Sequence, residues 1–159
     1  MTIMVDTGVF YALFDRSDIH HLDSLALLTH TLEGRFGAPY TTDFVVLEST
    51  LLLRGRGGPG MARALVKLLK KGGISVMLLD EEVYAEALEL FDERAETLSL
   101  CDAASLILMK KLDIQRLASY DERSFLAMAK HVVGRGYFES LEETKQKLIR
   151  TLDKTRALK

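Results

Sequence analysis

The 159-residue chain contains no tryptophan, no asparagine and a single cysteine, Cys101. One cysteine excludes a disulfide framework within the chain and a cysteine-ligated zinc cluster, and it suits a reducing compartment. Glycine and proline are also scarce, at 11 and 2 residues, which excludes a collagenous or low-complexity protein. Apolar runs such as 44–47 and 51–53 are far too short to span a bilayer.

The net charge is only −2, from 21 basic and 23 acidic residues. This balance excludes a protein that binds nucleic acid by bulk positive charge, although it is compatible with a local basic surface. Asp6 interrupts the first apolar segment, so we expect no secretory signal there. The composition therefore predicts a soluble, cytoplasmic protein without a membrane segment.

Short apolar or β-branched segments alternate with longer amphipathic segments along the chain. The short segments predict strands at residues 2–5, 38–41, 74–79, 116–119 and 132–133. The longer segments predict helices at residues 9–14, 19–33, 44–54, 61–71, 81–96, 100–111, 122–128 and 141–157. This alternation predicts an α/β protein, a three-layer α/β/α sandwich with a central parallel sheet.

Polar residues that favour helix starts precede several of these helices. The expected caps are Asp18, Asp43, Asp80 and Ser99, and Ser140 has the capping-box spacing to Glu143. The glycine-rich segment 55–60 lacks the Gly-Lys-Ser/Thr ending of a phosphate-binding loop. We expect a flexible turn between two helices there.

Four acidic residues lie at or near positions that a parallel sheet would bring to the carboxyl ends of its strands. Asp6 directly follows one predicted strand, and Asp121 comes two residues after the end of another. Glu48 lies in the helix after the second strand, and Asp102 lies in the first turn of a late helix. Such sheets bind ligands beyond the carboxyl ends of their strands. Capping of a helix is the alternative role for Asp6, Asp102 and Asp121.

Glu48 is harder to explain as a structural residue. Phe44, Leu51 and Leu52 share its helix face, and an acid in an apolar face is costly unless a positive group meets it. A cation at the edge of a site would meet that need. An ion pair with an arginine or lysine is the structural alternative.

Carboxylates that meet at one sheet edge repel each other unless a counter-ion is present. Ligand sets made of oxygen alone suit hard cations such as Mg²⁺ or Mn²⁺ rather than zinc or copper. Such ions bind phosphate oxygens and activate water for attack on phosphorus. The four acids therefore favour a metal-dependent site for phosphoryl chemistry, if the fold brings them together.

Four segments in this order resemble a PIN domain: MVDTGVFYALFD, TTDFVVLEST, LSLCDAASLILMKKLDI and LASYDERSF. Within that superfamily they resemble the VapC-type ribonuclease toxins, over residues 2–133. The resemblance implies an α/β/α sandwich that cleaves RNA with the help of Mg²⁺ or Mn²⁺. It also implies a homodimer and an antitoxin protein as partner.

The acids of the PIN motifs match the four acids of this chain residue by residue. The resemblance implies that Thr7 and Ser119 accompany the acids, with Ser119 orienting a carboxylate or a water. The metal-holding and catalytic set that it implies is Asp6, Glu48, Asp102 and Asp121.

Three features depart from the family pattern. Gly8 stands where many members carry a small polar residue, and Phe125 comes one residue later than usual. The chain also continues past the usual end of these toxins. We expect a PIN-like nuclease domain at residues 1–138 and a C-terminal helical extension at 139–159. The extension would pack on its own domain, on a dimer mate or on an antitoxin.

Basic residues outside the acidic motifs suggest a surface for RNA. Arg63, Lys67 and Lys70 recur at helical spacing. Together with Arg54 and Arg56 they would follow the RNA backbone. An ordinary solvated helix face is the alternative.

Three further residues carry weaker expectations. His21 is expected near the mouth of the site, as in similar toxins. Ser105 lies one turn after Asp102 and would either touch a substrate phosphate or lie on the helix surface. Cys101 is expected to be a buried, unreactive residue.

Two other functions stay open, a housekeeping RNA-processing PIN nuclease and a non-catalytic PIN-like interaction module. The presence of all four acids argues against the module, and metal-dependent cleavage would distinguish the module from a nuclease. A phosphoryl-aspartate enzyme usually has a second aspartate two residues after the first, where this chain has Gly8.

Overall fold

The computed structural model describes residues 2–125, 129 and 131–157. One sheet contains the strands β1 (Thr2–Val5), β2 (Ala38–Thr42), β3 (Ser75–Met77), β4 (Arg116–Ser119) and β5 (His131–Gly134). Around it lie the helices α1 (Thr7–Phe14), α2 (His21–Leu32), α3 (Asp43–Gly57), α4 (Pro59–Lys70), α5 (Glu81–Arg94), α6 (Leu100–Lys111), α7 (Glu122–Phe125) and α8 (Glu143–Ala157). Helices in these described ranges are too short or too polar to cross a membrane.

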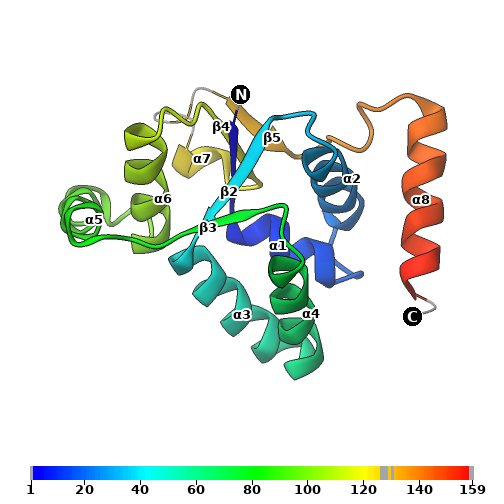
Figure 1. The fold of residues 1–159 in the computed structure, drawn as a ribbon, viewed down its shortest axis with the longest axis horizontal. Helices are drawn as coiled ribbons and strands as arrows, with labels where there is room; N and C mark the ends of the chain where they lie inside the picture. The colour runs from blue at the N-terminus through cyan, green and yellow to red at the C-terminus, as the bar shows by residue number, and fades with distance from the viewer. Residues whose placement is uncertain (1, 126–128, 130, 158–159) are drawn as a thin grey trace.

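The sheet has the strand order β3-β2-β1-β4-β5, and each neighbouring pair is parallel. Helices cover both of its faces (Figure 1), which confirms the three-layer α/β/α sandwich. The expected strands and most of the expected helices are present, and the part of the 122–128 helix beyond Phe125 lies outside the described residues.

Alternating side chains of β1 build the core on both faces of the sheet. Ile3 and Val5 are fully buried on the face covered by α1 and α2, and Met4 is fully buried on the face covered by α5 and α6. Burial of both faces is typical of a parallel strand.

The direction of winding reverses between β1 and β4. β2 and β3 extend the sheet on one side of β1, whereas β4 and β5 extend it on the other. The carboxyl ends of β1 and β4 therefore lie side by side at the point where sheets of this type bind ligands. Asp6, the first residue after β1, donates its backbone N–H to the Ala118 carbonyl of β4 at 3.0 Å.

Two of the predicted caps are confirmed and one is replaced by its neighbour. Asp80 caps α5 and Ser99 caps α6. Asp43 is not the cap of α3, because the Thr42 hydroxyl accepts the Val45 N–H at 3.0 Å and the helix has already begun at Asp43. A hydroxyl one residue earlier thus takes the capping position.

The predicted caps of α2 and α8 are wrong. The Asp18 carboxylate accepts the backbone N–H of His20, two residues later, at 2.8 Å, which makes a local turn before α2 rather than a cap. The Ser140 hydroxyl donates to the Tyr137 carbonyl, and α8 begins only at Glu143. In both places, a local turn uses the side chain that a cap would need.

The glycine-rich segment 55–60 is not a flexible turn. α3 continues to Gly57 and α4 begins at Pro59, so Gly58 alone separates the two helices. Gly58 has a φ of 81°, a conformation that is unfavourable for residues with a side chain. Pro59 occupies the first position of α4, which suits proline. A glycine inside a helix costs only about 1 kcal/mol, and the packing of α3 against α4 offsets that cost.

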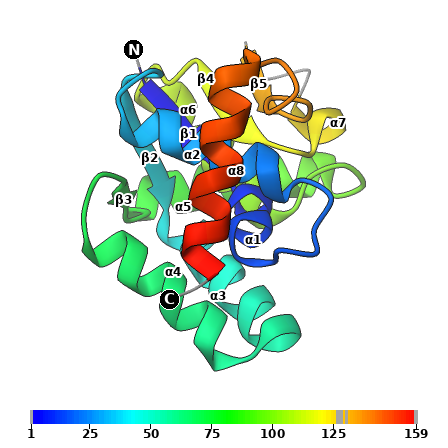
Figure 2. The same cartoon turned by 90° about the vertical axis from the view of Figure 1, so that its right-hand side faces the viewer.

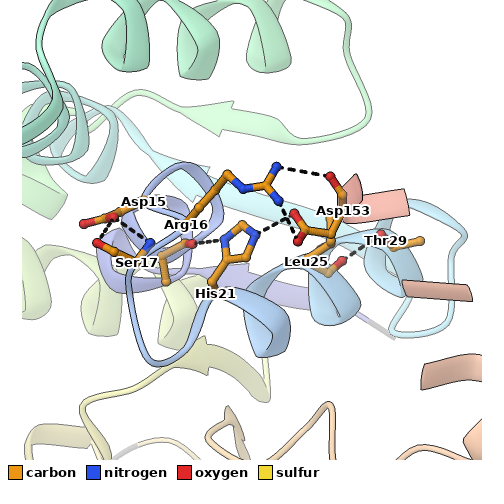
Figure 3. Close-up of polar contacts among 8 residues, drawn as sticks. Asp15, Arg16, Ser17, His21, Leu25, Thr29 and Asp153 are labelled. Atoms are coloured by element: carbon orange, nitrogen blue, oxygen red, sulfur yellow. Dashed lines mark hydrogen bonds and ion pairs between the residues drawn. The ribbon is translucent and has the colours of Figure 1, made fainter. Parts of the chain in front are cut away.

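α8 packs on α2 of the same chain (Figures 1 and 2), the first of the three arrangements considered. Asp153 accepts a hydrogen bond from Arg16 at 2.9 Å, and its other carboxylate oxygen lies 3.0 Å from Nε2 of His21 (Figure 3). The Nδ1 atom of His21 faces the Ala12 carbonyl at 2.7 Å. Ile149 is buried in the core beneath.

Asp153→Asn is expected to loosen α8, because it removes the charged partner of both Arg16 and His21. Loss of such buried or half-buried hydrogen bonds costs about 1–3 kcal/mol. The substitution should therefore increase the rate of amide hydrogen exchange more in α8 than in β1. The control is Glu143→Gln, which removes only the pairing with exposed Lys147. Equal exchange in the two variants would contradict the prediction.

Candidate active site

Asp6 lies where β1 ends and α1 begins, and it is 8 % exposed. Its Oδ1 accepts the Thr7 backbone N–H at 2.7 Å, which caps α1. Its Oδ2 accepts the Ser119 hydroxyl at 2.7 Å. Two hydrogen bonds therefore fix this carboxylate at the carboxyl edge of the sheet, and one of them is the capping bond considered from the sequence.

Ser119 joins two of the predicted acids. Its buried hydroxyl donates to Asp6 and accepts the Asp121 backbone N–H at 3.1 Å. Gly134 of β5 is the register partner of Ser119, and a Cβ atom at Gly134 would lie 2.1 Å from the Ser119 carbonyl oxygen. Only glycine therefore allows β5 to approach β4 at this point.

Glu48 points from α3 toward the start of α1, where its Oε2 accepts the Thr7 hydroxyl. None of the ion pairs among the described residues includes Glu48. The expected apolar core face around Glu48 is wrong, because Leu51 and Leu52 are 62 % and 37 % exposed. α3 packs on the core through a neighbouring face, formed by its buried residues Val45, Ser49 and Leu53.

Asp102 and Asp121 come from two further elements, α6 and the segment after β4. Asp102 forms a capping box at the start of α6, in which its carboxylate accepts the Ser99 N–H at 2.8 Å and the Ser99 hydroxyl accepts the Asp102 N–H at 3.1 Å. Asp102 is half-buried, and Asp121, two residues after the end of β4, is exposed. The capping role considered for Asp102 is therefore present.

A cavity of about 900 Å³ opens at the carboxyl edge of the sheet. The four predicted acids all line it, namely Asp6, Glu48, Asp102 and Asp121. Thr7, Gly8 and Tyr120 belong to its lining as well. The fold thus brings together, in one cavity, acids from four separate segments of the sequence.

The carboxylates in this cavity are close enough to affect one another. Burial raises the pKa of Asp6 from 3.8 to about 7, and the charges of Asp102 and Glu48 add to the rise despite the hydrogen bonds from Ser119 and Thr7. Burial also raises the pKa of Asp102, and the charges of Glu48 and Asp121 add to it. A bound cation would relieve this repulsion.

The donor set fits a hard, partly hydrated cation. All four acids offer carboxylate oxygens, which suit Mg²⁺ and Mn²⁺. Among the residues described, no three carboxylates, imidazoles or thiols are arranged as a ready-made metal cage. Mg²⁺ usually keeps several waters and binds through one or two carboxylates, so such a cage is not required.

Glu48→Gln is expected to leave the stability of the metal-free protein within about 1 kcal/mol of wild type, since glutamine still accepts the Thr7 hydroxyl. The substitution also removes one of the charges that raise the pKa of Asp6. Thermal unfolding in EDTA measures the change. A large loss of melting temperature would instead assign Glu48 a structural role.

The predicted basic surface lies away from the acidic cavity. Arg63, Lys67 and Lys70 are exposed on α4, and Lys67 lines an apolar groove between α1, α2, α4 and α8. Arg54 and Arg56 lie near the end of α3, and the Arg56 guanidinium is 5.4 Å from the centre of the Tyr11 ring. The structure therefore brings none of the five basic residues into the cavity.

Two of the weaker expectations are wrong and one is confirmed. His21 does not line the cavity, because its ring bridges Ala12 and Asp153 (Figure 3). Ser105 is 1 % exposed and so does not lie on the helix surface. Cys101 is buried, and burial raises the pKa of its thiol, which keeps it unreactive.

The cavity also contains charged residues that the sequence analysis did not identify, Glu96, Glu122 and Arg135. Arg135 directly follows β5, and the logic applied to the acids after β1 and β4 would have selected it. The sequence pattern predicts this strand at 132–133 only, which places its carboxyl end one residue before the observed end at Gly134. Glu96 lies in the turn after α5 and Glu122 is the first residue of α7, and neither position has a comparable signal.

Comparison with known proteins agrees with this combination of fold and acids. The model of the PIN domain matches residues 3–131, and the chain belongs to the PIN domain family. A VapC ribonuclease of Archaeoglobus fulgidus is 32 % identical over 151 residues, 94 % of this chain and 93 % of that protein. The crystal structure of Mycobacterium tuberculosis VapC20, a sarcin-ricin loop cleaving toxin, shares the fold with a TM-score of 0.71 and 24 % identity, over 80 % of this chain and 97 % of that one.

Proposed function

We propose that the protein is a divalent-metal-dependent endoribonuclease that acts as the toxin of a toxin–antitoxin pair. The observation that carries this proposal is the meeting of Asp6, Glu48, Asp102 and Asp121 in one cavity at the switch point of the sheet. The similarity to a VapC ribonuclease over 94 % of the chain supports RNA as the substrate, and we place the proposed action in the cytoplasm.

The acids have distinct surroundings that suit distinct tasks. Asp6 is held by Ser119 and Thr7, so it is the most rigid candidate ligand. Glu48 is oriented by the Thr7 hydroxyl and Asp102 by the start of α6. An ion held here by Asp6, Asp102, Asp121 and Glu48 would supply Lewis acidity for in-line attack of a water on the RNA phosphate.

The protonation and orientation of Asp6 and Glu48 affect the ability of the site to bind a cation. Because the pKa of Asp6 is raised to about 7, its carboxyl group must lose a proton before it offers two anionic oxygens. Ser119 stays hydrogen-bonded to Asp6 and keeps its carboxylate turned toward the cavity edge. Thr7 links Asp6 and Glu48, so the two acids keep a fixed relative position.

An antitoxin and a second copy of the chain are the proposed partners. A free ribonuclease would damage its own host, and an inhibitor could reach the acids with an arginine or lysine. Large apolar side chains are exposed on α3 and α5, which meet at an edge contact between Phe44 and Tyr84. These exposed side chains, Leu47, Leu51 and Leu88, support a homodimer.

The test of the chemistry is incubation of a mixed RNA pool with the protein in Mg²⁺, Mn²⁺ or EDTA. We expect cleavage with either metal and none in EDTA, and sequencing of the products gives the cut site. Absence of cleavage under all conditions would favour a non-catalytic PIN-like module.

The test of the toxin role is expression in a bacterial host. Wild type should slow growth, and co-expression with a small neighbouring gene product should yield a stable, inactive complex. Cleavage without an effect on growth and without a copurifying partner would favour a housekeeping RNA-processing nuclease.

A further inference from the structure

Arg135 brings a positive charge to an otherwise acidic cavity. It directly follows β5, whose last residue, Gly134, pairs with Ser119 of β4. The parallel register therefore delivers Arg135 to the same sheet edge as Asp121, and both line the cavity. Arg135 is the only cation among the described lining residues, and the charged residues around it are Asp6, Glu48, Glu96, Asp102, Asp121 and Glu122.

The guanidinium of Arg135 is not used to hold the fold together. Its side chain is exposed, and it takes part in none of the ion pairs or hydrogen bonds identified between described residues. The charge remains available to an anionic ligand, and a guanidinium pairs with phosphate through two parallel hydrogen bonds.

The backbone just after Arg135 is fixed by hydrogen bonds to a buried carboxylate. The buried carboxylate of Asp23 accepts the Gly136 N–H at 3.1 Å and the Phe138 N–H at 2.7 Å. Asp23 also lies 3.5 Å from His20, whose ring stacks on Tyr120 of the cavity wall at 4.1 Å. The segment after β5 is therefore connected through Asp23 and His20 to Tyr120 of the cavity lining. These contacts fix the position of the Arg135 backbone.

We infer that Arg135 binds a backbone phosphate of the RNA beside the one that is cleaved, and so positions the strand over the acids. This inference rests on the proposed nuclease function. A cavity lined by six carboxylates repels a polyanion, and charge compensation at the cleaved phosphate leaves the neighbouring phosphates uncompensated. A cation at the rim supplies the compensation there.

Binding of a fluorescein-labelled RNA dodecamer of randomised sequence tests the contact. Fluorescence anisotropy over a range of KCl concentrations, in an Asp6→Asn background that prevents cleavage, gives the Kd and its salt dependence. Arg135→Gln should raise the Kd about tenfold at low salt and reduce the slope of log Kd against log[KCl] by about 0.7, the value for one phosphate of a single strand. Arg135→Lys should keep the slope and recover part of the affinity.

Lys147→Gln on exposed α8 is the matched control, and it should change neither the Kd nor the slope. Melting temperatures of the Arg135 variants should equal that of the background protein, which separates a binding role from a structural one. In the cleavage-competent protein, Arg135→Gln should raise KM and spare kcat. A Kd and slope equal to those of the control would overturn the inference.

Cleavage by the wild-type protein decides the proposed function separately. If wild type cleaves RNA and Arg135→Gln behaves like the control, the phosphate contact is wrong and the nuclease stands. If wild type cleaves no RNA with any metal while the slope still falls in Arg135→Gln, the nuclease is wrong and the phosphate contact stands.

Discussion

Asp6→Asn should abolish metal-dependent RNA cleavage and leave the fold intact. Asparagine has nearly the same shape, and its side-chain oxygen can still accept the Thr7 N–H that caps α1. Its amide can donate to the Ser119 hydroxyl, which reverses that bond without breaking it. The lost group is the negative charge that attracts the ion, so kcat should fall by about 10³-fold or more.

Cleavage rates at saturating Mn²⁺ measure this effect. Asp92→Asn is the matched control, because Asp92 is exposed on α5 and does not line the cavity. It should retain the wild-type rate. A rate for Asp6→Asn that equals the control would remove Asp6 from the site.

Metal-free wild type should lose stability as the pH rises from about 4 to about 7. The pKa of Asp6 is raised from 3.8 to about 7 in the folded protein, mainly by burial. In this pH range the unfolded chain releases the Asp6 proton and the folded chain retains it, so rising pH favours unfolding. Stability from this group is complete below pH 3.8 and is lost as the pH passes the folded pKa.

The upper limit of the effect is about 4 kcal/mol, at 1.36 kcal/mol for each unit of pKa difference. A protein of this size changes its melting temperature by roughly 2–4 °C per kcal/mol, so a fall of several degrees is expected in EDTA. Asp6→Asn should flatten the pH profile and melt higher than wild type at pH 8. Identical pH profiles for the two proteins would show that the Asp6 carboxyl group does not cause the loss of stability.

Added Mg²⁺ or Mn²⁺ should oppose this loss, because the ion binds the carboxylate form and stabilises the folded state. The same experiment thus links catalysis and stability at one side chain. Asp6 destabilises the free protein at neutral pH for the same reason that it can hold a cation.

The sequence predicts the layout of the fold because its signals are local. Residues 2–5 form a short apolar segment that ends at an aspartate, and residues 116–119 end two residues before another one. In a parallel sheet, these two facts suffice to place Asp6 and Asp121 at one edge. Ser99 and Asp80 were recognised as caps because capping is also local.

The parts that were not predicted depend on contacts between distant residues. His21 contacts Asp153, which lies 132 residues later in the sequence, and no spacing rule relates the two residues. Glu48 accepts a hydrogen bond from a hydroxyl of α1, and its face of α3 is not the core face, since the rotation of α3 decides which face is buried. Arg135 was missed because the carboxyl end of a short strand is hard to locate to one residue.

The close approach of Gly134 to Ser119 limits which amino acids can occupy a position that carries no functional group of its own. Any side chain at 134 would meet the Ser119 carbonyl at 2.1 Å and force apart the two strands whose ends carry Asp121 and Arg135. At Gly8, by contrast, a methyl group would meet Tyr120 at an ordinary 3.5 Å. Between these two glycines, tolerance to mutation should therefore follow the spacing of backbones and not the distance to the acids.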